Sequence, residues 1–148
     1  YLGFNYRMTD IQAALGISQL DKLDWFVKRR REIAKKYNQE FKELPLDLPF
    51  TQEGYYSSYH LYTIKIKNEA KIDRRELYEK LRQKNIYTQV HYIPVHTFPY
   101  YREKFGYSWG DYPAAEDWYK KILSLPIFPG MSDEEINRVI KAVREVIK

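Results

Sequence analysis

The chain has 148 residues, of which 44% are hydrophobic and 30% are charged, a composition typical of one globular domain. No apolar run approaches the roughly 20 residues that a membrane span needs, and no secretory leader is visible, so we expect a cytoplasmic protein without a membrane partner. The absence of cysteine excludes disulfides and cysteine-based metal sites.

The first expected element is a long helix. Thr9 and Gln12 have the spacing of a capping box, which satisfies free amides in the first turn of a helix. Apolar residues then recur at intervals of three and four, interrupted where Arg30 takes the seam position. We therefore predict one helix from about Asp10 to about Glu43, ended by the prolines that follow.

Two strands are expected in the middle of the chain. Residues 58–66 and 86–92 are rich in aromatic and β-branched side chains, and each is predicted to form a strand. Between them, Asp73 is suited to cap a helix that runs from Arg74 to about Lys84, and Asn85 suits the turn after it.

The last third of the chain is predicted to be mainly helical. Short helices are expected over residues 100–105 and from Pro113 to about Ile122, followed by an extended segment at 125–130. Ser132 and Glu135 form a second capping box before a terminal amphipathic helix. We predict an α/β architecture, with residues 1–44 as an interface motif and linking helix, and residues 45–148 as a small α/β domain.

The charge and aromatic content leave two binding functions open. The net charge is +5, and the chain contains 15 tyrosines, which suit interfaces and stacking on sugars or bases. Much of the positive charge lies within residues 28–36, together with Glu32 and close to Asp21 and Asp24, which favours a solvated helix face. A nucleic-acid-binding module and a stand-alone interaction module remain alternatives.

Two polar segments are candidates for chemistry. Asn5 and Arg7 precede a predicted helix start, where backbone amides favour an anion such as phosphate. A second polar segment lies at the end of the predicted strand at 86–92 and extends to His96: Gln89, Val90, His91 and Tyr92. The two neighbouring histidines lack the spacing of a helical metal pair, so no metal site is predicted.

Several of these segments together resemble one protein family. The segments GFNYRMTDIQAALG at 3–16, RREIAKKY at 30–37, QVHYIPVH at 89–96 and LSLPIFPGMS at 123–132 are similar to the DegT/DnrJ/EryC1/StrS family of pyridoxal phosphate (PLP)-dependent sugar-nucleotide aminotransferases. Within that family, QVHY at 89–92 and YYREKFGY at 100–107 most resemble the members that aminate C4 of a UDP-linked keto sugar on the pseudaminic acid route.

The resemblance implies a fold and a place in a longer protein. The chain would be the C-terminal small domain of a fold-type I PLP-dependent transferase, with a small, mainly antiparallel sheet, helices packed on it, and a long connecting helix before it. The lysine that forms the Schiff base with PLP would precede residue 1, so no catalytic residue is assigned here. We expect the chain alone to be inactive.

The resemblance also implies roles for the two polar segments in a homodimer with a shared active site. Asn5 would reach the cofactor phosphate of the partner subunit. The nucleotide-sugar substrate would contact the other candidates, with glutamate as the amino donor: Arg7, Gln89, Val90, His91, Tyr92 and His96. Because Asn5 and Arg7 would serve a site shared with other parts of the enzyme, we expect them to be exposed in this chain.

Overall fold

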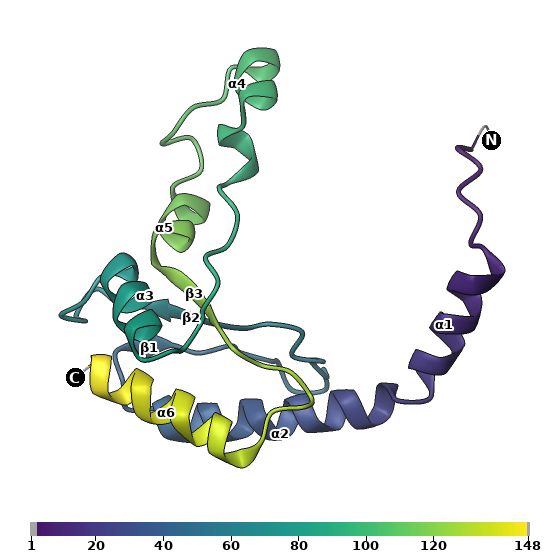
Figure 1. Cartoon of the computed structure of the whole chain (residues 1–148). Coiled ribbons are helices and arrows are strands. Elements are labelled where there is room, and N and C mark those ends of the chain that lie inside the picture. The colour runs from purple at the N-terminus through teal and green to yellow at the C-terminus, as the bar shows by residue number, and fades with distance from the viewer. Residues whose placement is uncertain (1–2, 148) are drawn as a thin grey trace.

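The computed structural model describes residues 3–147. The sheet consists of β1 (Leu46–Asp47), β2 (Tyr62–Ile66) and β3 (Ile122–Leu125), and the helices are α1 (Asp10–Leu20), α2 (Leu23–Phe41), α3 (Arg74–Gln83), the 3-10 turn η1 (Val95–Thr97), α4 (Pro99–Phe105), α5 (Pro113–Lys121) and α6 (Asp133–Ile147). Two parts extend from the central body: α1 with the residues before it, and an arm that carries α4 at its end (Figure 1). We define the arm as residues 95–112.

The sheet is antiparallel, and β2 is its central strand. β2 pairs with β1 and β3, with Ile64 opposite Leu123 in the second pair. Side chains of β2 alternate because its two faces differ: Tyr62, Ile64 and Ile66 are buried, while the residues between them are half-buried. The predicted α/β fold class with a small antiparallel sheet is therefore confirmed.

Helices cover the apolar face of the sheet. α6 packs against both α2 and α3, and α2 and α6 run side by side in Figure 1. The terminal helix begins as predicted, because Ser132 and Glu135 exchange side-chain bonds with each other's backbone amides. Its apolar stripe lies entirely in the core: Ile136, Val139, Ile140, Val143 and Ile147. On the other face of the sheet, α5 lies beside β2, and Asp117 bonds Lys65.

The predicted helix from Asp10 to Glu43 is interrupted after its first eleven residues. The Thr9–Gln12 capping box forms as predicted. The N–H of Lys22, however, bonds the carbonyl of Gln19 instead of continuing the four-residue pattern, and α2 begins at the next residue. Among the described residues, α1 buries no side chain, whereas α2 buries four. The apolar spacing in the sequence continues through the break. It therefore could not show that only α2 packs against the core.

The predicted strands were only partly correct. The first is shorter than expected, since β2 begins at Tyr62. The segment 86–92 is not a strand: only Gln89 pairs, in an isolated bridge to Ser124, and Pro94 cannot donate a ladder bond. The third strand lies at Ile122–Leu125, three residues before the predicted segment. All four of its residues are buried, so it lacks the alternation that marks a half-exposed strand.

Candidate functional site

Asn5 and Arg7 lie on the extended segment before α1. Both side chains are exposed, as expected, and within residues 3–147 neither makes a hydrogen bond or an ion pair. Asn5 has a positive φ of 58°, a conformation that Asn tolerates better than most residues, and the N–H of Arg7 bonds its carbonyl oxygen at 2.8 Å. The turn therefore exposes the neutral amide of Asn5 and the guanidinium of Arg7 to solvent.

The second polar segment is attached to the edge of the sheet. The backbone N–H of Gln89 donates to Ser124 O at 3.1 Å, and the N–H of Ser124 donates to Gln89 O at 2.9 Å. The Nε2 atom of His91 also contacts Oγ of Ser124, which bonds Thr63 Oγ1 from its other side. Tyr92 then points into solvent with 83% of its surface exposed. Gln89, His91 and Tyr92 thus lie on one segment that is attached to β3 at Ser124, and their contact with a substrate stays a prediction.

His96 differs from the other candidates because it is enclosed. It lies in η1, only 9% exposed, with Nε2 3.0 Å from Oε1 of Glu116 in α5. The ring of Tyr112 packs on it at 4.7 Å between centroids. The N–H of Gly110 donates to Glu116 Oε1 at 2.7 Å; this bond and the one from His96 lower the pKa of the Glu116 carboxyl, although burial opposes them.

The two polar segments are not in contact within the described residues. The Asn5 turn lies at the end of the α1 extension, and the Gln89 segment lies at the base of the arm, on separate parts of the molecule in Figure 1. No hydrogen bond between residues 3 and 147 joins them. The proposed shared site is therefore not assembled by these residues alone.

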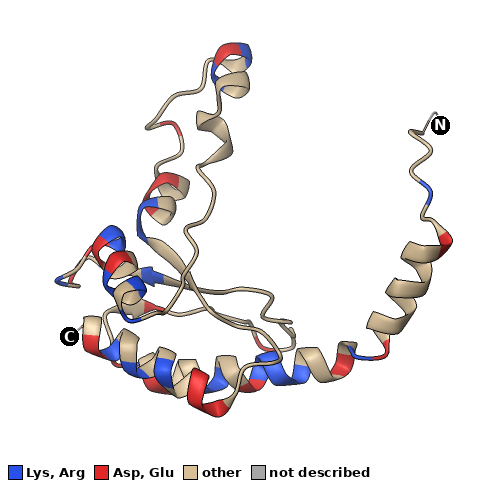
Figure 2. Cartoon of the chain, in the orientation of Figure 1, with Lys and Arg blue, Asp and Glu red and all other residues tan. Residues whose placement is uncertain are grey.

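The basic stretch of α2 is largely engaged within the chain. Arg29 bonds Met131 O at 2.8 Å, Arg30 bonds three backbone carbonyls, and Arg31 bonds Ser57 O at 2.8 Å. Figure 2 shows acidic and basic residues interspersed along α2 and α6. Because its arginines already have partners, this helix gives no support to the nucleic-acid alternative.

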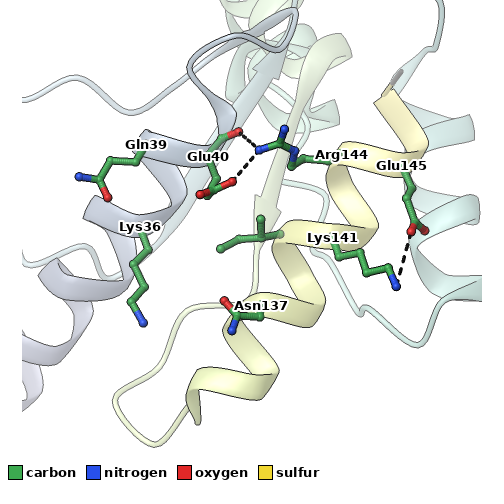
Figure 3. Close-up of a pocket in the computed structure, with 8 residues that line it drawn as sticks. Lys36, Gln39, Glu40, Asn137, Lys141, Arg144 and Glu145 are labelled. Atoms are coloured by element: carbon green, nitrogen blue, oxygen red, sulfur yellow. Dashed lines mark hydrogen bonds and ion pairs between the residues drawn. The ribbon is translucent and has the colours of Figure 1, made fainter.

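The groove between α2 and α6 holds about 660 Å³ (Figure 3), and none of the candidate site residues lines it. Arg144 reaches across it to Glu40, with Nη1 2.6 Å from Oε2, and Lys141 lies beside Glu145 on the same helix. The two charges of each ion pair neutralise each other, and most of these side chains are half-exposed. The groove is therefore best described as the interface between two helices, bridged by an exposed ion pair.

Two residues that contact the candidate site residues were missed by the sequence reasoning. Ser124 anchors the Gln89 segment, and Glu116 anchors His96. A signal existed for Ser124, which is the single polar residue in the run Ile-Leu-Ser-Leu. Glu116 gave none, because an acidic residue in the first turn of a helix is ordinary.

In residues 3–147 no group of three or more His, Asp or Glu side chains is arranged to hold a metal ion. None of the helices described there is long and apolar enough to cross a membrane.

Comparison with known proteins gave consistent matches. Residues 1–144 match the DegT/DnrJ/EryC1/StrS aminotransferase family. The spore coat polysaccharide biosynthesis protein SpsC of Bacillus subtilis is 44% identical over 149 residues, which cover 99% of this chain and 38% of SpsC. The chain therefore spans about two fifths of the length of this curated relative.

Solved structures show the same fold. Helicobacter pylori PseC, an aminotransferase involved in the biosynthesis of pseudoaminic acid, superposes with a TM-score of 0.86 at 30% identity, covering 99% of this chain and 39% of PseC. The PLP form of the sugar aminotransferase Spr1654 from Streptococcus pneumoniae has a TM-score of 0.84 at 28% identity, covering 96% of this chain and 37% of Spr1654.

Proposed function

Because the chain belongs to the DegT/DnrJ/EryC1/StrS aminotransferase family, we propose that it is the C-terminal portion of a PLP-dependent enzyme that aminates a keto sugar. The family match over residues 1–144 carries this proposal. The amino donor is glutamate, and the acceptor is a deoxy sugar linked to a nucleotide, with UDP as the carrier. The product enters the synthesis of a cell-surface polysaccharide or glycan.

The names of two relatives support the substrate class. SpsC takes part in spore coat polysaccharide biosynthesis, and PseC takes part in pseudoaminic acid biosynthesis. The exposed ring of Tyr92 suits such a substrate, since an aromatic face stacks on a sugar or base while its hydroxyl accepts or donates a hydrogen bond.

The donor set around Asn5 fits a phosphate group such as that of PLP. The Asn5 amide can donate a neutral hydrogen bond to that phosphate, while the Arg7 guanidinium supplies charge and a planar pair of donors for a phosphate of the substrate. Asp10, one residue after the helix cap, places a negative charge nearby, so Asn5 rather than the helix start is assigned to the phosphate. In a homodimer, the Asn5 turn of one subunit reaches the cofactor of the other.

The chain's own residues bind and orient the substrate in this mechanism. PLP supplies the electron sink for moving the amino group, and the lysine that exchanges protons belongs to the preceding part of the enzyme. Arg7 binds substrate phosphate. Gln89, His91 and Tyr92 hydrogen-bond and stack on the nucleotide sugar, and Val90 provides apolar contact. Their attachment to β3 through Ser124 holds them in place before the substrate arrives.

The test uses the full-length protein that contains this chain. Purified protein is expected to show the visible absorbance of bound PLP and to convert a UDP-linked 4-keto sugar with glutamate, as followed by chromatography and mass spectrometry. UDP-N-acetylglucosamine, which has no keto group on its ring, serves as the substrate control. Protein that binds no PLP, or that binds PLP but aminates no keto sugar nucleotide, would contradict the proposal.

A further inference from the structure

Residues 90–94 form a short span that is held at both ends. At one end, Gln89 and Ser124 exchange two backbone hydrogen bonds, and His91 contacts the Ser124 hydroxyl. At the other end, Nε2 of His96 lies 3.0 Å from Oε1 of Glu116. The first anchor lies on β3 and the second on α5, and the first residue of β3 directly follows the last residue of α5. The two anchors are therefore part of one continuous framework.

The anchor at His96 is buried and shared by three segments. Glu116 is 5% exposed and accepts bonds from His96 in η1 and from the Gly110 amide in the turn after α4. The rings of Tyr112 and Trp109 lie against His96, with centroids 4.7 and 6.3 Å away. One carboxylate thus joins the outgoing and returning ends of the arm to α5. Removing this carboxylate should release both ends of the arm, because His96 and the Gly110 amide would each lose a buried hydrogen-bond partner.

The span 90–94 carries exposed apolar side chains. Val90, Tyr92 and Ile93 are 38%, 83% and 48% exposed. An exposed apolar segment is normally free to rearrange, but here both of its ends are fixed. Binding a ligand on such a segment costs little conformational entropy, which is the advantage of a preorganised contact surface.

We infer that His96 and Glu116 are positioning residues, which hold the span 90–94 in the conformation that contacts the nucleotide sugar. The ligand class rests on the proposed function. His96 does not itself touch the substrate, because its ring is enclosed by Tyr112 and one of its two nitrogens is bonded to Glu116. This assignment replaces the substrate contact expected of His96 from the sequence.

The test compares four variants of the full-length protein. His96→Ala removes the anchor. His96→Gln introduces an amide that can donate to Glu116 and should restore the anchor. Glu116→Gln removes the charge while keeping the shape of the side chain. His60→Ala is the matched control, since His60 is exposed and lies outside the arm. Hydrogen exchange measured by mass spectrometry reports on the span, and steady-state kinetics report on its use.

The expected pattern has three parts. His96→Ala should speed amide exchange in residues 90–97 and raise the KM for the sugar nucleotide, each by about tenfold, the effect of losing one hydrogen bond to a charged group. The values of kcat and of the half-reaction with glutamate should change by less than about twofold. His96→Gln should restore most of both properties, Glu116→Gln should give the His96→Ala pattern at smaller size, and His60→Ala should match the wild type.

Three results would overturn the inference. Unchanged exchange in residues 90–97 would show that His96 does not hold the span. A fall in kcat without a rise in KM, not rescued by His96→Gln, would make His96 a direct participant. Faster exchange throughout α2 and α6, or unfolding of both His96→Ala and Glu116→Gln, would assign the pair to general stability. If the wild type aminates no sugar, the proposed function fails, while the exchange data still decide whether the span is anchored.

Discussion

The guanidinium of Arg30 donates through Nη1 to the carbonyl oxygen of Ile127 at 2.9 Å, although the two residues are 97 positions apart in the sequence. The same nitrogen lies 3.2 Å from Tyr59 O and 3.1 Å from His60 O. Arg30 occupies the position on α2 where the apolar pattern is interrupted, so a half-buried charged side chain stands where an apolar one would continue the pattern. It joins the helix to the segment before β2 and to the segment after β3.

Replacing Arg30 should therefore destabilise the domain more than removing an exposed cation from the same helix. We expect Arg30→Ala to lower the free energy of unfolding by about 2–3 kcal/mol, because partly buried carbonyls lose a charged donor. Lys35→Ala is the control, since Lys35 is exposed on α2. Urea denaturation followed by circular dichroism measures both variants, and equal midpoints would show that the hydrogen bonds of Arg30 add no net stability.

The buried hydroxyl of Tyr37 provides a second test of the core. It donates to Pro126 O at 2.9 Å, and burial raises the pKa of Tyr37 well above its usual value. Tyr37→Phe should cost about 1–2 kcal/mol of unfolding free energy, because the carbonyl loses its partner while the ring remains. Tyr55→Phe, at an exposed position, should cost nothing measurable. A stable Tyr37→Phe protein would mean that water replaces the hydroxyl.

The pH dependence of stability should carry a contribution from Asp117. Bonds from Lys121 and Lys65 lower the pKa of this carboxyl from 3.8 to about 2. Because the folded pKa is below the unfolded value, the contribution is fully present above about pH 4 and is lost as the pH falls toward 2. Asp117→Asn should lower the melting temperature at pH 7 and converge with the wild type near pH 2. Glu69→Gln, an exposed control, should parallel the wild type throughout, and a parallel Asp117→Asn curve would contradict the assignment.

The proposed cofactor contact of Asn5 can be tested without straining the backbone. Asn5→Gly removes the amide and tolerates the positive φ of 58°, which alanine would not. In the full-length protein we expect PLP to be retained about ten- to a hundredfold more weakly, as for one lost hydrogen bond to a charged group. Asn85→Gly is a matched control, since Asn85 also has a φ of 58°. Equal PLP retention in both variants, measured by absorbance after dialysis, would remove Asn5 from the cofactor site.

Local signals in the sequence predicted much of the helical structure. The two capping boxes and Asp73 correctly marked helix starts, because each relies on hydrogen bonds between residues three apart. Pro113 begins α5 and Asn85 follows α3, as predicted. The strands were harder, because a strand is defined by its partner and β3 is buried on every residue.

The sequence by itself determined the starts of α1, α3, α5 and α6, the core stripe of α6 and the family resemblance, since each depends on the order of neighbouring residues. Only the tertiary structure decided that the first helix breaks at Lys22, that Gln89 forms one bridge instead of a strand, and that His96 is buried against Glu116. The last two depend on contacts between residues 20 or more positions apart, which form only after the chain has closed the loops between them. Periodicity along the chain carries no record of such contacts.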